Sequence, residues 1–336
     1  MVGPTNSANQ GSEWSKALSR SGFTSRSLRI STDPDAEWFA TDIAFARHEW
    51  LIPSFRKKFE VDVARNVDVF LFESLRPIFR PRDTKDSRNL TLQDFDFMKR
   101  IGKKSGVIFH GSDIRDVDSH TLRSEFSPFH TNRPELEQVR IRSNENRALL
   151  PEIRARKIPI FVSTKDLLTD VPDARWLPVA IDFPKFAEVA TNSPLFASSK
   201  LRVLFLPSRS WVKSAELIEP ILRKLSKEEV IDYVNPGPIK HGEVPELLSR
   251  VDLVIDQFLG VVGVFPIEAL AAGRLVMSYV PSGSSDAPII NITPETLEAE
   301  LRRVASERPM PVQGVDYAKK WHDGRASVEV ITKSFG

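Results

Sequence analysis

Residues 251–280, VDLVIDQFLGVVGVFPIEALAAGRLVMSYV, constrain the fold of this chain more than any other segment. The apolar run Leu253–Ile255 predicts a buried strand. A glycine-containing loop follows, and Pro266 and Gly273 are expected to lie at the start and the end of a short helix. A second apolar run begins at Leu275. The order strand, loop, helix, strand is typical of a parallel α/β sheet.

The loop before this helix has the composition of a phosphate site. Gly260 and Gly263 leave backbone N–H groups accessible, and the positive end of the helix points at the same place. Glu268 lies one turn into the helix. A carboxylate beside a phosphate site is expected to hold a neutral part of the ligand, such as ribose hydroxyls.

Composition excludes several classes of protein. The chain has 336 residues, a net charge of +2 and no cysteine, so it is long enough for two domains and contains neither disulfides nor thiolate metal sites. No charge asymmetry or motif indicates nucleic-acid binding. No apolar run approaches the ~20 residues of a membrane span, and the N-terminus does not resemble a signal peptide. These features favour a cytoplasmic α/β protein.

Strand-like and helical runs alternate on both sides of residues 184–200, a segment rich in Pro, Ser, Ala and Asn that we interpret as an interdomain linker. We expect an N-terminal domain at 1–186, a second domain at 187–316 and a last helix at 317–336. Two such domains suit a ligand held at the sheet edges.

Two cations follow the expected strand at 201–206. Arg209 and Lys213 are placed to bind a pyrophosphate, Arg with its planar fork and Lys as a point charge. The alternative is that both are exposed cations on a surface loop.

A second polar cluster follows the strand at 106–109 and has the sequence FHGSDIR. His110 and Asp113 could line a ligand site there. The alternative is a turn in which Asp113 caps the residues that follow.

The segment ending in Glu268-Ala-Leu-Ala-Ala-Gly273 resembles the donor-binding motif of retaining GT-B glycosyltransferases of family four (glycosyl transferases group one). FHGSDIR is similar to a variant in their bacterial polysaccharide-type members. The resemblance implies an α/β GT-B fold, in which two Rossmann-like, doubly wound domains face a central cleft. The last helix would cross back to the first domain.

The resemblance also implies roles for individual residues. Catalysis would rest on four side chains: His110, Arg209, Lys213 and Glu268. The donor would further contact Gly11, Asp113, Gly263, Val264 and Phe265, although a glycine such as Gly11 is also common near a helix start. No metal and no cofactor are implied beyond the nucleotide diphosphate sugar itself, because the cations and the helix end would neutralise the phosphates.

The implied function is transfer of a sugar from that donor to a hydroxyl of a glycan or lipid-linked acceptor. One departure is Gly260, where the family often has an acidic residue. Because of Gly260, a degenerate, non-catalytic binding subunit is an alternative, and a nucleotide-sugar epimerase is a second one because that enzyme class shares the implied fold.

A basic and apolar patch at 50–58, WLIPSFRKK, indicates possible peripheral contact with the inner face of the plasma membrane, as in many relatives with lipid-linked acceptors. The alternative is a solvated helix face with one buried side.

Overall fold

The computed structural model describes residues 1–32, 39–79, 90–207, 210–281 and 283–336. The chain forms two compact units. Unit 1 contains Met1–Asp116, Glu137–Ala180 and Gly324–Gly336, and unit 2 contains Val117–Leu136 and Ile181–Asp323. One passage of the chain from unit 1 to unit 2 falls between residues 180 and 181.

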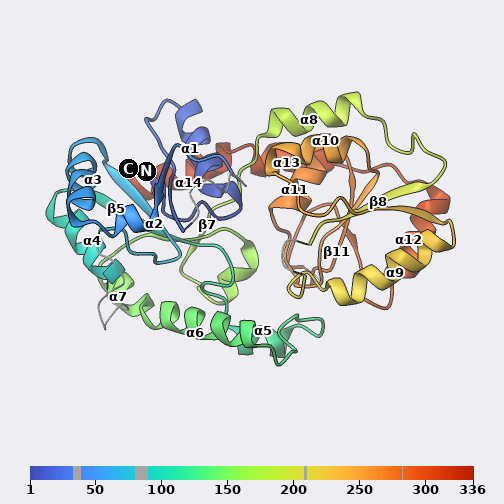
Figure 1. Ribbon diagram of the computed structural model, residues 1–336, viewed down its shortest axis with the longest axis horizontal. Helices are drawn as coiled ribbons and strands as arrows, with labels where there is room; N and C mark the ends of the chain where they lie inside the picture. The colour runs from blue at the N-terminus through green and yellow to red at the C-terminus, as the bar shows by residue number, and fades with distance from the viewer. Residues whose placement is uncertain (33–38, 80–89, 208–209, 282) are drawn as a thin grey trace. The chain divides into compact units, whose positions relative to one another are not determined.

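Unit 1 is built on a five-stranded parallel sheet of order β1-β4-β5-β6-β7 (Figure 1). Its strands are β1 (Val2–Gly3), β4 (Val69–Glu73), β5 (Lys104–Phe109), β6 (Ile160–Val162) and β7 (Arg175–Trp176). A separate parallel pair is formed by β2 (Leu28–Ser31) and β3 (Ile43–Ala46). The helices are α1 (Gln10–Arg20), α2 (Arg47–Trp50), α3 (Pro53–Asn66), α4 (Leu90–Arg100), α6 (Pro134–Ala148), α7 (Leu150–Ala155) and α14 (Arg325–Phe335). Two 3-10 turns are η1 (Ser7–Asn9) and η2 (Lys165–Thr169).

Unit 2 repeats the parallel architecture with the strand order β12-β11-β10-β8-β9. Its strands are β8 (Leu201–Phe205), β9 (Ile231–Val234), β10 (Leu253–Ile255), β11 (Leu275–Ser278) and β12 (Ile290–Asn291). Its helices are α5 (Val117–Arg123), α8 (Phe183–Asn192), α9 (Ala215–Lys227), α10 (Val244–Ser249), α11 (Val264–Ala271), α12 (Leu297–Glu307) and α13 (Gly314–His322), with a 3-10 turn η3 (His241–Glu243). α9 packs on α12, and α8 packs on α10, α11 and α13 (Figure 1).

Both sheets are buried on their two faces, which explains the nearly continuous apolar runs of their central strands. In unit 1 the core includes several packed aromatic rings among its aliphatic side chains, and Phe70 and Phe72 of β4 have ring centroids 4.6 Å apart. In unit 2 the core is mainly aliphatic around Leu253 and Ile255 of β10. The strand expected at 201–206 is confirmed as β8.

Two segments differ from expectation. Residues Phe183–Asn192, which we interpreted as linker, form helix α8, because Pro184 suits the first turn of a helix and Phe186 and Val189 bury one side of it. The expected helix at 317–336 is two helices, α13 and α14. They separate at Gly324, which has φ +96° and approaches Ala17 so closely that an added Cβ would lie 2.5 Å from the Ala17 Cβ.

Candidate functional site

In unit 1, the carboxyl ends of β1, β4 and β5 converge on the carboxylate of Glu73. This residue ends β4, and its side chain has no exposed surface. The backbone N–H groups of Thr5 and Asn6 each donate to Glu73 Oε2 at 2.8 Å, and the Ser7 N–H donates to Oε1 at 3.3 Å. The loop after β1 therefore places its amides around an anion that belongs to the protein itself.

His110, the first residue after β5, is the fourth group bound to this carboxylate. Its Nε2 lies 3.0 Å from Glu73 Oε1. The ring stacks on Trp14 of α1, with centroids 5.8 Å apart and planes 18° apart. The His110 side chain is 14% exposed, so the ring lies at the surface of unit 1 while its partner is fully buried.

Glu73 and His110 shift each other's pKa in opposite directions. Burial favours the neutral form of both groups. For Glu73 the hydrogen bond and charge of His110, with the N–H groups of Asn6 and Thr5, outweigh burial and lower the pKa of the carboxyl. For His110 the hydrogen bond and charge of Glu73, with the charge of Asp113, outweigh burial and raise the pKa of the imidazole. Both shifts favour the charged pair.

Asp113 occupies the turn after His110. Its carboxylate accepts the backbone N–H of His110 at 3.0 and 3.1 Å and that of Gly111 at 2.8 Å, and it accepts the hydroxyl of Ser74 at 2.6 Å. These contacts match the turn-capping alternative for Asp113. Its contact with a donor stays a prediction.

Gly11 lies inside α1 and faces the loop after β1. An added Cβ would lie 3.2 Å from Asn6 Oδ1 and 3.6 Å from Glu73 Oε2. The glycine thus permits close packing of the helix on the Glu73 site. Its proposed contact with a diphosphate also stays a prediction.

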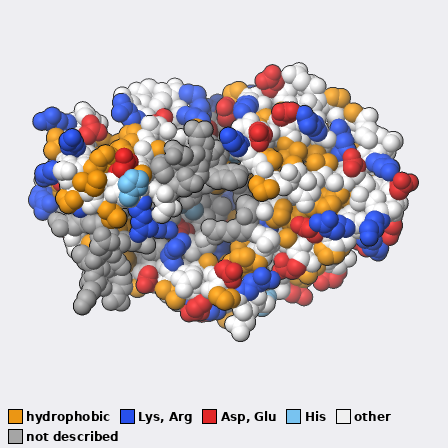
Figure 2. Space-filling view, viewed as in Figure 1, with side chains coloured by type: hydrophobic (Ala, Val, Ile, Leu, Met, Phe, Trp, Pro, Cys, Tyr) orange, Lys and Arg blue, Asp and Glu red, His pale blue; other side chains and the backbone are white. Residues whose placement is uncertain are grey.

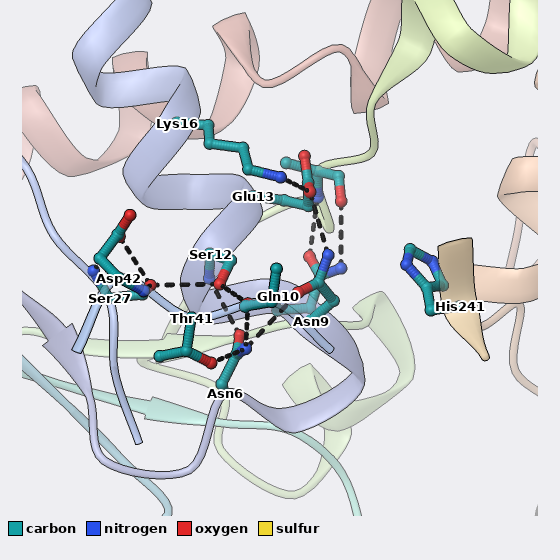
Figure 3. A network of polar contacts seen from close by, with 12 residues as sticks. Asn6, Asn9, Gln10, Ser12, Glu13, Lys16, Ser27, Thr41, Asp42 and His241 are labelled. Carbon is teal, nitrogen blue, oxygen red and sulfur yellow. Dashed lines mark hydrogen bonds and ion pairs between the residues drawn. The ribbon is translucent and has the colours of Figure 1, made fainter. Parts of the chain in front are cut away.

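A polar network fixes the loop after β1 in an unusual conformation (Figure 3). Asn6, Ala8 and Asn9 all have positive φ, at 49°, 48° and 63°. Asn6 Nδ2 donates to Thr41 Oγ1 at 2.9 Å, and the Ser12 N–H donates to Asn6 Oδ1 at 3.0 Å. Left-handed residues other than glycine each cost about 1 kcal/mol or more and recur at ligand sites. Residue spacing does not predict this network.

In unit 2, Lys213 forms an ion pair with Asp256, the first residue after β10. The Lys213 side chain is 17% exposed and that of Asp256 is 1% exposed. Within the described residues, Asp256 Oδ2 has no hydrogen-bond partner. Arg209, the second expected clamp residue, lies outside the described residues.

The glycine loop of unit 2 has the predicted form. α11 begins at Val264 directly after Gly263, so Gly263, Val264 and Phe265 lie at the N-terminal end of the helix. Pro266 occupies the third helical position rather than the first. Gly273 has φ +68° just beyond the helix end, as the sequence predicts. Gly260 has φ +84°, and an added Cβ there would lie 3.1 Å from Pro281, so a larger residue would be strained.

Glu268 is buried in α11 and binds a histidine that the sequence analysis did not assign. His241 Nε2 lies 2.6 Å from Glu268 Oε1, and the two side chains are 23% and 4% exposed. His241 lies in the loop between β9 and α10, which leads from the same sheet edge as the loop after β10. The available signal was a histidine in the loop 235–243, which contains two prolines and two glycines.

A segment from the N-terminal half of the sequence packs on the glycine loop of unit 2. His120 Nε2 donates to the carbonyl oxygen of Leu259 at 3.0 Å. Phe126 contacts Tyr279 edge-on with centroids 5.1 Å apart, and Phe129 lies 6.3 Å from Trp211. Residues Val117–Leu136 therefore support the loop around Gly260, a role that sequence order did not suggest.

In the described residues, no three His, Asp or Glu side chains cluster as metal ligands would. Within the same residues, no helix has both the length and the apolar character needed to cross a membrane.

Comparison with known proteins identifies the fold of this chain. No protein-family model matches the sequence, and no curated protein matches it significantly. A solved sucrose-phosphate synthase from Thermosynechococcus elongatus is similar with TM-score 0.58 and 12% identity over 95% of this chain and 90% of that chain. An alpha-glucosyltransferase solved with UDP and a 13-mer DNA is similar with TM-score 0.57 and 10% identity over 97% of this chain and 94% of that chain. Both are GT-B glycosyltransferases, so the chain has the expected GT-B fold.

Proposed function

We propose that the chain is a retaining glycosyltransferase that moves a sugar from a nucleotide diphosphate sugar to a hydroxyl of a glycan or lipid-linked acceptor. One observation carries the proposal. At a single edge of the unit 2 sheet, the structure combines a glycine loop leading into α11, a cation at Lys213 and a buried carboxylate at Glu268. These three groups match the diphosphate and the ribose of such a donor.

The groups would act as follows. The N–H groups of Gly263, Val264 and Phe265 and the positive end of α11 would bind the diphosphate. Lys213 has three donor hydrogens, so it can contact a phosphate oxygen while it keeps Asp256. Because these charges stabilise the departing diphosphate, the proposed reaction is independent of a metal. Arg209 would add a bidentate contact.

Glu268 would bind the ribose hydroxyls. A hydroxyl donating to a carboxylate makes a charge-assisted hydrogen bond, which is worth more than a bond between neutral groups. The hydrogen bond that His241 Nε2 donates to Glu268 Oε1 would orient the carboxylate before the ligand binds. In unit 1, His110 would face the transferred sugar.

Contact with a membrane-bound acceptor would use the α2–α3 patch, defined by Leu51, Ile52, Lys57 and Lys58. Leu51 is 40% and Ile52 49% exposed, and both lysines are exposed. Figure 2 shows hydrophobic and basic side chains together on the part of the surface where Figure 1 places α3. Trp50, which we also assigned to the patch, is instead core: it is 4% exposed and donates to the Ile78 carbonyl at 2.8 Å.

The test is to incubate the protein with a panel of nucleotide sugars. We expect binding of one nucleotide series and slow release of free sugar, whose anomeric configuration matches that of the donor when product is observed early by NMR. Epimerisation at C2 of the sugar would support the epimerase alternative. Binding without any turnover, with and without acceptors, would support the non-catalytic alternative. Absence of binding by every nucleotide would contradict the proposal.

A further inference from the structure

Glu73 is a residue that the proposed function does not use, although it is the most completely bonded carboxylate of the candidate site. Its two oxygens accept three backbone N–H groups from residues 5–7 and the Nε2–H of His110. The side chain has no exposed surface. Glu73 therefore cannot contact a ligand directly, and any effect on a ligand must pass through His110.

The surroundings of His110 leave one ring atom available. Nε2 is directed at Glu73, and one ring face is covered by Trp14. Within the described part of the chain, no hydrogen bond involves Nδ1 of His110, while the side chain is 14% exposed. The carboxylate of Glu73 fixes Nε2 as a donor, and so it decides which nitrogen can face a ligand.

We propose that Glu73 is a positioning residue, which binds Nε2 of His110 and thereby presents Nδ1–H of the ring to an oxygen of a ligand at this edge of the unit 1 sheet. The proposal rests on the proposed function for the identity of the ligand. The proposal also explains why the backbone N–H groups of residues 5–7 in the loop after β1 are already hydrogen-bonded. Because these groups donate to Glu73, unit 1 offers a ligand the imidazolium of His110 and not the loop N–H groups.

The charges around His110 agree with this arrangement. From β4 it faces Glu73, and from the turn after β5 it faces Asp113, both of which raise its pKa. α1 contributes the neutral Trp14, and the residue after β6 contributes the neutral Ser163, whose hydroxyl lies 3.4 Å from the His110 carbonyl oxygen. A cation close to this turn, Arg115, lies with its Nη2 3.9 Å from the position of an added Gly111 Cβ and forms an ion pair with Asp166.

The first test needs no ligand. Histidine side-chain ¹⁵N NMR of the wild-type protein should show a His110 titration midpoint above the ordinary value of about 6.5, with both ring nitrogens protonated below that midpoint. Glu73→Gln should lower that midpoint. The control is Asp173→Asn, which removes a half-exposed carboxylate of unit 1 that pairs with Arg154 and should leave the His110 midpoint unchanged. An unprotonated Nδ1 in the wild-type protein would overturn the proposal, even if Glu73→Gln does not fold.

The second test uses UDP and UDP-glucose as probes. The wild-type affinity for UDP-glucose should fall as pH rises through the His110 midpoint, and the fall should move to lower pH in Glu73→Gln by the same interval as the NMR midpoint. His110→Gln should weaken UDP-glucose binding by about tenfold or more, which is the size expected for a hydrogen bond to a charged group. A pH profile that is identical in the wild type and Glu73→Gln would overturn the positioning role. If no nucleotide sugar binds the wild type, the proposed function is wrong. The NMR titration still tests whether Glu73 sets the protonation of His110, because it needs no ligand.

Discussion

The two sheet edges of this protein hold their buried carboxylates in different ways. In unit 1, Glu73 is bound by three backbone N–H groups as well as by His110. In unit 2, Asp256 is paired with Lys213 and Glu268 with His241, and both partners are side chains from loops. Backbone donors are fixed by the fold, whereas loop side chains can turn to a new partner. The difference indicates a preorganised edge in unit 1 and an edge in unit 2 whose contacts can be exchanged for those of a ligand.

The largest expected effect is loss of stability at Glu73. Glu73→Ala removes the acceptor of four donors and leaves His110 without its counter-charge, which should lower the free energy of unfolding by about 3–5 kcal/mol. Chemical denaturation measures this change. Asp173→Ala, at a half-exposed ion pair, is the control and should change stability by less than about 1 kcal/mol. A loss at Glu73 as small as that of the control would mean that the unit 1 edge is not preorganised.

The next effect concerns Lys213 and binding. Lys213→Ala should weaken nucleoside diphosphate binding by about 1.5–3 kcal/mol, because a charge-assisted contact is lost. Calorimetric titration measures the affinity. Since the mutation also leaves Asp256 uncompensated, Lys213→Ala/Asp256→Asn should recover stability without recovering affinity. The matched control is Lys224→Ala, because Lys224 lies on α9 and forms an exposed ion pair with Glu298 of α12. Equal affinities for all three variants and the wild type would remove Lys213 from the diphosphate site.

A similar or smaller effect is expected at Glu268. Glu268→Gln should still fold but bind nucleotides less tightly by about 1–3 kcal/mol, because the ribose hydroxyls lose a charged acceptor. The control is Glu246→Gln, which affects an exposed pair with Arg250 on the neighbouring helix α10. If the melting temperature falls while the nucleotide affinity stays that of the wild type, Glu268 only stabilises helix α11 and the contact with His241.

The smallest effect is the pH dependence of stability. The raised pKa of His110 contributes stability that is fully present below the unfolded value of about 6.5 and is lost as pH rises through the higher folded pKa. The lowered pKa of Glu73 contributes stability present above its unfolded value of about 4.3 and lost as pH falls through the lower folded pKa. The unfolding free energy of the wild type minus that of His110→Gln should therefore be greatest at about pH 4.5–6.5 and should fall above that window. A difference that rises with pH above about pH 6.5 would contradict the assigned charges.

The sequence predicted the local parts of the fold and of the site. The order β10, glycine loop, α11 and β11 follows from apolar runs and from Gly273, whose positive φ ends the helix. These signals lie close together in the sequence, so residue spacing alone predicts these elements. Composition misled us at α8, because Pro184 marks a helix start there and not a linker.

The remaining contacts could not be read from spacing. Glu73 and His110 are 37 residues apart, and His241 and Glu268 are 27 apart, so each pair depends on which strands become neighbours in a sheet. For the same reason we did not predict the hydrogen bond from His120 to the carbonyl oxygen of Leu259, because the two residues are 139 apart in the sequence. A single sequence gives the residue types at a sheet edge but not their partners.

One measurement tests the contrast between the two edges most directly. Histidine side-chain ¹⁵N spectra should be recorded with and without UDP, ADP, GDP and TDP in turn. We expect the nucleotide that binds to shift the resonances of His241, because Glu268 turns to the ribose, while the His110 Nε2 resonance stays that of a nitrogen bound to Glu73. A bound nucleotide that leaves His241 unchanged and instead releases His110 from Glu73 would contradict the account.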